Sequence, residues 1–466
     1  MDLSAPTCYQ AVLSHDRRFD GVFFTCVKST GIYCRPICPA IVPKQANCTF
    51  VSSAAEAEKA GYRPCLRCRP EHAPAHINGV ADSLADRLAS HIEETLLADE
   101  TLSEVARRFN VSERHLRRLF VQRFGLEPKA FLTTRRLLFA KQLLQDSSLP
   151  ITHIAYSVGF GSPGRLTITM KKAYGFTPER LRRETHVHKS AQPLMLRADY
   201  RPPFGWTALL QFLQKRATPD EWVDGQTYHR LVDGREIIIT NVPDKSYLTV
   251  RLPLELSRQA HAILAKTRRL FDLDANPVSI ETALAADPLL SRLVAKYPGL
   301  RVPGCWDSFE TLLRAVIGQQ VSVAGATTLM RRVAESIGIT AAAISGSTPE
   351  AIAALGFPHK RAATIWSLGN AVQSGALQLD ESDPQLFYEN LIAIPGIGPW
   401  TAEYLRMRVL HWPDAFPAGD LGLQKALVPG ERQTPRQLEA RALTWRPWRS
   451  YATMLLWKSL EEQGGK

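Results

Sequence analysis

Hydrophobic periodicity changes in blocks along the chain and predicts elements of different kinds. From residue 84 to about residue 184, apolar positions recur every three to four residues, as in amphipathic helices. Residues 235–242 and 246–252 are short runs rich in β-branched and aromatic side chains, which indicates strands. The helical period returns over 254–271 and dominates from about residue 276. A chain of 466 residues is too long for one hydrophobic core, so several domains are expected.

The breaks between these blocks give the expected domain boundaries. Residues 72–83, HAPAHINGVADS, have the composition of a linker, and THVHKSAQP, residues 185–193, marks a second break. We therefore predict a multidomain α+β protein with four parts. They are a small α/β domain over 1–76, an all-α domain over 84–186, an α+β domain over 195–275 and an all-α domain over 276–466.

Charge is concentrated in the second predicted domain. The formal net charge is +12, and residues 101–141 hold ten Lys and Arg against three Asp and Glu, while residues 163–183 hold six against one. These two stretches account for the whole excess, and both have helical patterns with an apolar face. A solvated surface is the ordinary explanation of such runs, but this arrangement favours nucleic acid as the partner. The sequence contains neither a 20-residue apolar window nor a secretion signal, so we expect a cytoplasmic protein.

Seven of the eight cysteines precede residue 70, and four of them have the spacing of a metal site. Cys34 and Cys38 form one close pair, and after 26 intervening residues Cys65 and Cys68 form another. Two such pairs suit tetrahedral Zn²⁺, one per chain, with an iron centre or free thiols as alternatives. The other cysteines are expected to be small buried residues: Cys8, Cys26, Cys48 and Cys305.

The surroundings of the four cysteines carry a family resemblance. STGIYCRPICPA, NCTF and AGYRPCLRCRP are similar to the N-terminal domain of Ada-type alkylation-repair proteins over about the first 75 residues. The resemblance implies that Cys34 accepts a methyl group from a methylated phosphotriester in DNA, once per molecule. Thiolate ligands stay ionised on zinc, and methylation removes one negative charge from a surface that faces phosphates. A purely structural zinc site is the alternative. Basic residues flanking the metal could hold the DNA backbone: Arg35, Lys44, Arg67 and Arg69.

The basic region contains two helix-turn-helix patterns. TLSEVARRFNVSERHLRRLFVQRFG has an apolar first helix, Ser112 as an N-cap and an arginine-rich second helix, and a similar arrangement follows a long helix over 128–144. The pair resembles the AraC-type DNA-binding domain, down to YGFTPERLR, with a basic helical bundle as the alternative. In the first unit four residues would face the major groove: Glu113, Arg114, Arg117 and Arg118. Pro163 and Gly164 at the start of the second recognition helix leave its base reading open.

In the C-terminal half, LIAIPGIGPWTAEYLRMRVL predicts two helices joined by a turn that contains Gly396 and Gly398. Glycines allow unusual backbone angles, and bare amides at the next helix start can approach a DNA phosphate. Asp420 follows in DAFPAGDLGLQKAL, directly before another helix. An N-cap role and a catalytic role are equally well supported for this carboxylate, and the two are compatible.

Residues 195 to about 463 resemble the helix-hairpin-helix 3-methyladenine DNA glycosylases, including RPPFGWTALLQFL, RVPGCWDSFETLLRAVIGQQVSVAGA and WRPWRSYATMLLW. The resemblance implies a TATA-binding-protein-like α+β domain followed by the glycosylase domain. It also implies base flipping into a pocket of Trp400, Tyr404 and Trp457, with Asp420 stabilising positive charge on the sugar. A cationic alkylated base leaves readily, so little general acid is needed. Core packing is the alternative for each ring, and it is the expectation for Trp448.

Several departures and absences refine this picture. Trp400 stands where lyase-type relatives carry a lysine, so we expect no Schiff base. The C-terminal half also lacks a cysteine quartet, so we expect no iron–sulfur cluster. Gln320 stands where relatives present an apolar wedge beside the flipped base. The sequence has no Pro-Cys-His-Arg motif, so repair of O6-methylguanine is not expected. A monovalent cation at the hairpin is a further candidate ligand.

Together, these features predict an alkylation-damage response protein that joins an Ada-type regulator to a monofunctional 3-methyladenine glycosylase. The alternative is a methylation-activated transcriptional regulator whose glycosylase half only binds damaged DNA. Expected partners are alkylated duplex DNA and a promoter site, with RNA polymerase as a candidate, and we expect a monomer without membrane contact, associated with a bacterial nucleoid. The promoter sequence, the lesion range and the coupling between the halves do not follow from the sequence.

Overall fold

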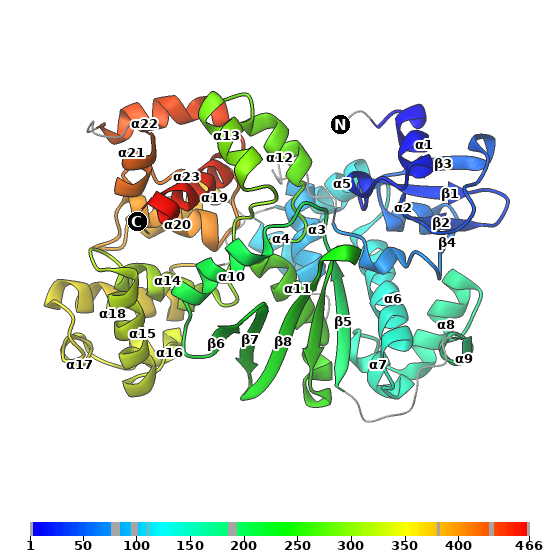
Figure 1. Ribbon diagram of the computed structural model, residues 1–466. Coiled ribbons are helices and arrows are strands. Elements are labelled where there is room, and N and C mark those ends of the chain that lie inside the picture. The colour runs from blue at the N-terminus through cyan, green and yellow to red at the C-terminus, as the bar shows by residue number, and fades with distance from the viewer. Residues whose placement is uncertain are drawn as a thin grey trace. The chain divides into compact units, whose positions relative to one another are not determined.

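The computed structural model describes residues 3–75, 84–94, 101–109, 111–184, 193–379, 383–427 and 433–463 (Figure 1). It contains two compact units. The first comprises Met1–Pro202, Val232–Arg268 and Leu273–Asn276, and the second comprises Pro203–Leu231, Arg269–Asp272 and Pro277–Lys466. Most of the predicted linker, from residue 76 on, lies outside the described residues.

The N-terminal part of the first unit is a four-stranded sheet of order β3-β1-β2-β4 with two helices. Strand β1 pairs antiparallel with β2 and β3, and β2 pairs parallel with the two-residue β4. A small apolar cluster that includes Phe24, Cys26 and Tyr33 fills its core. The sheet therefore positions Cys34 at the end of β2 and the second cysteine pair just after β4. The elements are α1 (Ala5–Leu13), β1 (Phe24–Val27), β2 (Ile32–Cys34), β3 (Cys48–Val51), α2 (Ala54–Lys59) and β4 (Arg63–Pro64).

The part of the chain described between residues 84 and 184 is helical, as the periodicity predicted. A capping box between Thr101 and Glu104 starts α4, and Ser112 caps α5 by accepting from the His115 N–H at 3.2 Å. Pro163 occupies the first turn of α8, where its missing N–H costs no hydrogen bond. The helices are α3 (Leu84–Glu94), α4 (Leu102–Arg108), α5 (Glu113–Phe124), α6 (Pro128–Asp146), α7 (Ile151–Ser157), α8 (Pro163–Tyr174) and α9 (Pro178–Glu184).

The strands predicted at 235–242 and 246–252 are confirmed as β8 (Arg235–Val242) and β9 (Tyr247–Leu252). In the first unit β9 pairs antiparallel with β8 on one side and with β5 (Leu194–Asp199) on the other. Their inward side chains alternate with exposed ones, as a half-buried sheet requires. The helix predicted over 254–271 forms only from Ala260, as α11 (Ala260–Leu270), because Pro253 is followed by a 3₁₀ turn over Leu254–Gln259.

Buried ion pairs join the segments of the first unit. Arg35, with a side chain that is 1% exposed, pairs with Asp20 and, at 2.8 Å, with Asp199 of β5. Lys141 of α6 is fully buried and donates to both carboxylate oxygens of Glu71 at 2.6 Å. Charges this deeply buried are tolerated only when they are paired, so these contacts fix which segments pack together.

Glu58 of α2 is a second buried link between the cysteine-bearing sheet and the helical region. Its Oε1 accepts from the hydroxyls of Tyr33 and Tyr174 at 3.0 Å, and its Oε2 accepts from Thr134 at 2.8 Å. Burial raises the pKa of Glu58 to about 7, although the three hydroxyls oppose the rise.

The second unit is mainly helical, as predicted for residues beyond 276. A strand pair, β6 (Glu221–Asp224) and β7 (Thr227–Val232), is antiparallel and follows α10 (Trp206–Lys215). The large apolar cluster of this unit is built mostly on α14, α15, α18, α19 and α20. The further helices are α12 (Pro277–Leu284), α13 (Pro288–Lys296), α14 (Ser308–Ile317), α15 (Val323–Ser336), α16 (Ala341–Ser345), α17 (Pro349–Ala353), α18 (His359–Gln373), α19 (Pro384–Ile392), α20 (Pro399–Arg408), α21 (Leu421–Leu427), α22 (Pro435–Arg441) and α23 (Arg449–Gln463).

The architecture confirms the predicted fold class, a multidomain arrangement of small sheets and helical domains. The exact four-part division stays a prediction. Among the described helices, none combines the length and apolar character needed to cross a bilayer.

Replacing Glu58 with Gln should flatten the pH dependence of stability. The folded state holds a proton on Glu58 up to about pH 7, whereas the unfolded chain releases it near the ordinary value of 4.5. The Glu58 contribution is therefore complete below about pH 4.5 and is lost as pH rises to 7 and above, on the order of 3 kcal/mol in total. Denaturant unfolding at pH 5 and pH 8 should show a smaller difference for Glu58→Gln than for the wild type. Equal pH differences in the two proteins would contradict this assignment.

Candidate functional site

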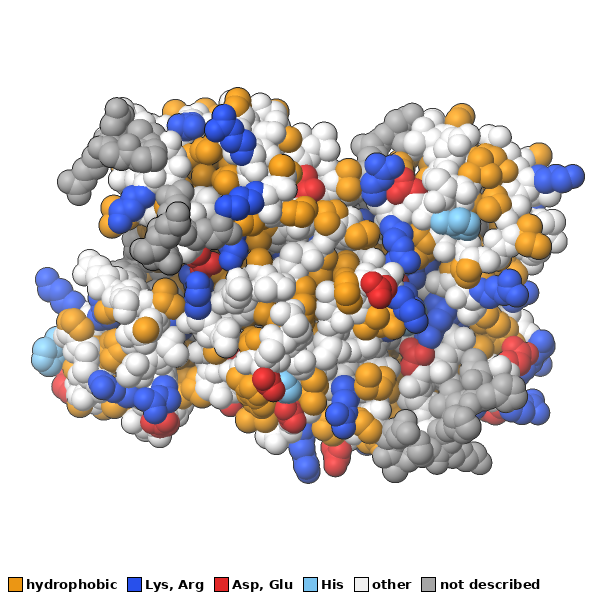
Figure 2. All heavy atoms as spheres, viewed as in Figure 1, with side chains coloured by type: hydrophobic (Ala, Val, Ile, Leu, Met, Phe, Trp, Pro, Cys, Tyr) orange, Lys and Arg blue, Asp and Glu red, His pale blue; other side chains and the backbone are white. Residues whose placement is uncertain are grey.

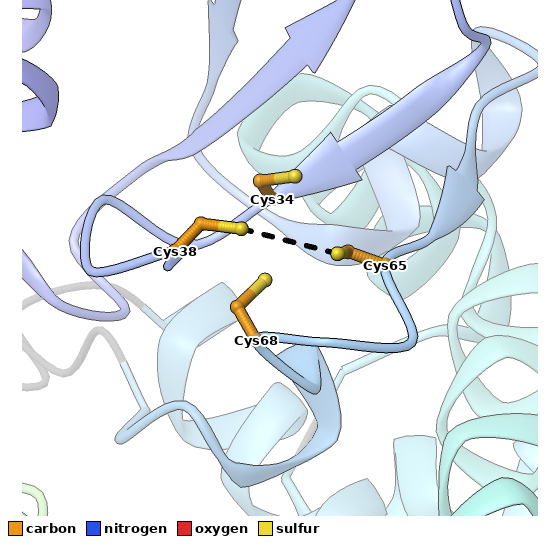
Figure 3. Close-up of side chains that lie close together, drawn as sticks. All are labelled: Cys34, Cys38, Cys65 and Cys68. Atoms are coloured by element: carbon orange, nitrogen blue, oxygen red, sulfur yellow. Dashed lines mark hydrogen bonds between the residues drawn. The ribbon is translucent and has the colours of Figure 1, made fainter. Parts of the chain in front are cut away.

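The four predicted metal ligands meet in one place. The Sγ atoms of Cys34, Cys38, Cys65 and Cys68 all lie within 4.8 Å of one another, and Cys38 and Cys65 are 3.9 Å apart (Figure 3). Ligands at about 2.3 Å from a tetrahedral Zn²⁺ would be about 3.8 Å from each other. The separation of Cys38 and Cys65 matches this value, and the whole cluster is close to the size of a tetrahedral zinc site.

Within this cluster Cys34 differs from its partners in exposure. Its side chain is partly exposed, whereas the other three thiols are buried. Among the remaining cysteines Cys8, Cys26 and Cys305 are buried as expected, and burial raises the pKa of the Cys26 thiol to about 12. Cys48 is partly exposed, contrary to expectation, because it begins the edge strand β3.

The expected DNA contact of Arg35 has to be corrected. Its guanidinium is buried against Asp20 and Asp199, and it also donates to the carbonyl of Cys68 at 3.2 Å. Its backbone N–H donates to Cys68 Sγ at 3.3 Å. Arg35 therefore supports the cysteine loop instead of presenting a charge to solvent. Arg69 is likewise paired, with Glu71 and Asp146, whereas Arg67 and Lys44 are exposed and remain available.

In the first helix-turn-helix unit, α5 presents all three predicted arginines to solvent: Arg114, Arg117 and Arg118. Arg117 pairs with Glu113 at 2.5 Å, and Arg118 is 2.9 Å from His115 Nδ1. Such exposed pairs are weak and can be exchanged for phosphate or base contacts. On the face shown in Figure 2, Lys and Arg side chains are interspersed with acidic and hydrophobic ones, so the charge excess does not form one uniform patch there.

The turn between α19 and α20 uses its two glycines differently. Gly396 has a φ of +91°, and a Cβ there would lie 2.1 Å from Thr364 Oγ1. Gly398 has an ordinary φ of −100°, and a Cβ there would meet open space. The expectation of special backbone angles therefore holds for Gly396 only. At Gly398 the bare backbone leaves room for a phosphate to approach the N-terminus of α20.

Asp420 lies at the centre of the second candidate site, where it is held by three donors. The indole N–H of Trp400 donates to its Oδ2 at 2.8 Å, and that of Trp457 donates to its Oδ1 at 3.0 Å. The backbone N–H of Leu423 donates to the same Oδ1 at 2.9 Å, so Asp420 also caps α21. The N-cap role considered from the sequence is therefore present, and the catalytic role stays a prediction that this cap does not oppose.

The loop that carries Asp420 is fixed from two neighbouring helices. Glu403 of α20 accepts from the Phe416 N–H at 3.0 Å. At the start of α23, the Arg449 guanidinium donates to the carboxylate of Asp414. The Ser450 hydroxyl lies within hydrogen-bond distance of the carbonyls of Trp412 and Ala415. Gly422 follows, where a Cβ would lie 2.9 Å from Asp420 Oδ1. The sequence analysis missed these supporting residues, although Gly422 stands only two positions from the carboxylate.

The predicted pocket rings lie together beside Asp420. Trp400 and Tyr404 are stacked with ring centroids 5.4 Å apart and an interplanar angle of 6°, and Trp457 lies 6.3 Å from Tyr404. All three rings are partly exposed, whereas Trp448 is buried, as expected for a packing residue. Arg408, one helical turn after Tyr404, donates to the Tyr404 hydroxyl at 2.7 Å. In the sequence, the only indication of this contact is that Arg408 comes four residues after Tyr404, a spacing at which side chains on a helix meet.

Gln320 lies in the loop between α14 and α15, exposed and with a φ of +57°. Its neighbour Gln319 donates to the Gly396 carbonyl and to Thr401 Oγ1, both at 3.1 Å. These two contacts, which the sequence analysis did not predict, tie the loop between α14 and α15 to the hairpin, while Gln320 itself is exposed.

Family models match four stretches of the chain. Residues 7–71 match the metal binding domain of Ada, and residues 105–184 match a helix-turn-helix domain. Residues 195–307 match the AlkA N-terminal domain, and residues 313–449 match the HhH-GPD superfamily of base excision DNA repair proteins. Each matched stretch contains residues singled out above, and the two candidate sites fall in different stretches.

Two related proteins support the same combination of domains. The chain is 36% identical to the probable bifunctional transcriptional activator/DNA repair enzyme AlkA of Mycobacterium tuberculosis, over 97% of this chain and 96% of that one. It is 37% identical to DNA-3-methyladenine glycosylase 2 of Escherichia coli, over 56% of this chain and 96% of that one.

A solved structure supports the fold of the second half. The 3-methyladenine DNA-glycosylase of Archaeoglobus fulgidus matches with a TM-score of 0.50 and 22% identity, over 56% of this chain and 97% of that one. With a full-length relative at 36% identity, the chain belongs to the family of AlkA-type bifunctional transcriptional activator/DNA repair enzymes, which join an Ada-type metal domain and a helix-turn-helix region to a helix-hairpin-helix glycosylase.

Proposed function

We propose that the second half of the chain hydrolyses the N-glycosidic bond of alkylated purines, 3-methyladenine above all. The observation that carries this proposal is the convergence of Asp420 with Trp400, Tyr404 and Trp457. A base flipped from the duplex would stack on the rings, and its sugar would lie near the carboxylate. Relatives whose names describe a 3-methyladenine glycosylase support the same choice of substrate.

Asp420 supplies negative charge where the sugar becomes positive. As the bond to the base breaks, the electron pair leaves with the neutral purine, and the sugar gains oxocarbenium character that a carboxylate stabilises. Both carboxylate oxygens already accept hydrogen bonds, which keeps the group oriented but leaves lone pairs for a water molecule. Water then adds to the sugar and gives an abasic site.

The proposal includes the absence of a lyase step. Trp400 occupies the hairpin position at which a lysine would be needed for a Schiff base, and its indole N–H is already committed to Asp420. Gln320 would fill the space left by the flipped base and could hydrogen-bond to the unpaired partner base. The monovalent cation at the hairpin stays a prediction, and the Gly396 carbonyl there already accepts from Gln319.

For the N-terminal domain we propose stoichiometric methyl transfer to Cys34. The four thiolates would hold Zn²⁺, which keeps them ionised at neutral pH. The sulfur of Cys34 attacks the methyl carbon of a phosphotriester, an S–C bond forms, the O–C bond breaks, and the electron pair stays on the phosphate oxygen. Cys34 fits this role because it is partly exposed, whereas the other three members of the cluster are buried. The loss of one negative charge would then strengthen DNA binding.

With the DNA affinity increased in this way, the helix-turn-helix region would bind a promoter through α5. The charge concentration in residues 101–141 and the exposed arginines of α5 support this role. Contact with RNA polymerase, a monomeric state and a cytoplasmic, nucleoid-associated location stay predictions that follow from DNA as the substrate.

Replacing Asp420 with Asn should lower the rate of 3-methyladenine release from alkylated duplex DNA by about two to three orders of magnitude. Asparagine keeps the size of the side chain but loses the charge, so single-turnover release is the measurement and binding to undamaged DNA is the control. Under the alternative, a regulator whose second half only binds damage, the wild type would release no base at all.

Borohydride added during turnover should trap no covalent complex, and the product strand should remain intact until it is heated with alkali. A trapped complex of protein and DNA would show that an amine elsewhere in the chain performs lyase chemistry.

Purified protein should contain about one zinc per chain, and incubation with methylphosphotriester DNA should add about 14 Da to Cys34. Cys34→Ala should lose the adduct, whereas Cys48→Ala, which removes a partly exposed cysteine outside the cluster, should keep it. Modification of Cys38, Cys65 or Cys68 in place of Cys34 would refute the choice of acceptor.

A further inference from the structure

The two helix-turn-helix units share the same local frame. Ser112 caps α5 and Ser162 caps α8, and each hydroxyl accepts from the backbone N–H three residues later at 3.2 Å. Both helices span 12 residues and end at a glycine with a left-handed backbone, Gly125 with a φ of +71° and Gly175 with a φ of +75°. Each position of α8 therefore has an equivalent in α5, at the same distance from the capping serine.

The buried faces of the two helices are also equivalent. Leu166 and Met170 of α8 are fully buried, as are the residues at the equivalent positions of α5. Tyr174, in the last turn of α8, is buried and donates its hydroxyl proton to Glu58 at 3.0 Å. These contacts fix which face of α8 points to solvent.

The exposed faces of the two helices, in contrast, carry different chemistry. On α5, Arg114 and Arg118 are exposed, and an arginine can pair with two acceptors of one guanine. Their equivalents on α8 are Gly164 and Ile168, neither of which has a hydrogen-bonding group in its side chain. The helix α8 therefore cannot read guanine at these positions in the way proposed for α5.

Ile168 lies at the centre of the exposed face of α8. It is 71% exposed, and Gly164 and Lys172 stand one helical turn before and after it. Arg165 and Lys171 are exposed on either side of it. An isoleucine at such a place contributes little to folding, because it buries little apolar area and loses side-chain freedom in a helix. The face thus has an apolar centre with a basic border, and that border is complementary in charge to DNA phosphates.

The major groove contains one apolar group that this centre can recognise, the 5-methyl group of thymine. The other three bases present only polar groups there, and an isoleucine would remove water from those groups without replacing its hydrogen bonds. Gly164 favours a close approach of the helix to the base edges. A Cβ at Gly164 would project into open space, with Ser162 Oγ 4.0 Å away, so the absence of a side chain leaves that space for DNA.

We propose that α8 reads thymine in a second half of the promoter site, through apolar contact of Ile168 with the 5-methyl group, while Arg165, Lys171 and Lys172 bind the flanking phosphates. The inference rests on the proposed binding of a promoter by the helix-turn-helix region and adds what its second unit recognises. Ile168 determines specificity, whereas the three basic residues contribute affinity that does not depend on sequence. The protein would thus bind a site with two unlike halves, one containing guanine at α5 and one containing thymine at α8.

The first experiment finds the site and then removes single methyl groups from it. Duplexes that bind the full-length protein are selected from a random pool, and the common sequence is made again with deoxyuridine in place of one thymidine at a time. Uracil differs from thymine only by the lost methyl group. At one or two positions this replacement should weaken equilibrium binding about fourfold, as expected for one buried methyl group, and elsewhere it should have little effect.

Variants then assign the effect to one side chain. Ile168→Ala should bind the thymine and uracil duplexes equally, because alanine is too short to reach the methyl group. Ile168→Arg, which introduces the residue found at the equivalent position of α5, should select guanine at the same place in the site. Arg118→Ala should weaken binding but keep the preference for thymine. Leu443→Ala, which removes a side chain of similar size at a residue of the second unit that is 54% exposed, is the control and should behave like the wild type.

The inference is overturned if the wild type binds the thymine and uracil duplexes equally at every position, or if Ile168→Ala keeps the wild-type preference. The latter result would give the exposed isoleucine another role, such as contact with a partner protein. Failure of the proposed promoter binding would look different, because the selection would then return no common sequence, and the inference would fail with it.

Discussion

The hydrogen bonds from two indoles to one carboxylate hold the second candidate site together. Trp400 of α20 and Trp457 of α23 are 57 positions apart in the sequence, and each donates to a different oxygen of Asp420. Those bonds orient the carboxylate and at the same time fix the two rings beside it. The α21 cap and the contacts of Glu403, Arg449 and Ser450 keep the intervening loop in register. Under the proposed function, catalytic charge and base recognition would therefore depend on one set of contacts.

The first unit is organised by a similar principle, with buried charges in place of indoles. The cysteine loop is supported by Arg35, whose guanidinium is neutralised by Asp20 and Asp199, and the helical region is joined to the cysteine-bearing sheet through Lys141, Glu71 and Glu58. Each of these groups would be costly to bury alone, so each specifies its partner. A methyl group gained at Cys34 would change the charge directly beside Arg35, which is the residue that connects this loop to β5.

Sequence patterns predicted local features well because those features depend on nearby residues. The cysteine spacing, the cap at Ser112, the strands β8 and β9 and the hairpin turn were all evident from short segments. The role of Arg35 was not, because its partners lie 15 and 164 positions away. The same reason applies to Gln319, which contacts the hairpin 77 positions further on, and to Arg408, whose carbonyl partners are more than 100 positions away. Charge on an arginine predicts DNA contact only when no buried carboxylate is available.

The central claim is that Asp420 stabilises positive charge on the sugar within a pocket formed by Trp400, Tyr404 and Trp457. It is tested most directly by the affinity for two duplexes that carry abasic-site analogues, one with a cationic pyrrolidine ring and one with a neutral tetrahydrofuran ring. The account predicts that the wild type binds the cationic analogue at least about a hundredfold more tightly, and that Asp420→Asn removes most of this difference. Equal affinity of the wild type for the two duplexes would contradict it.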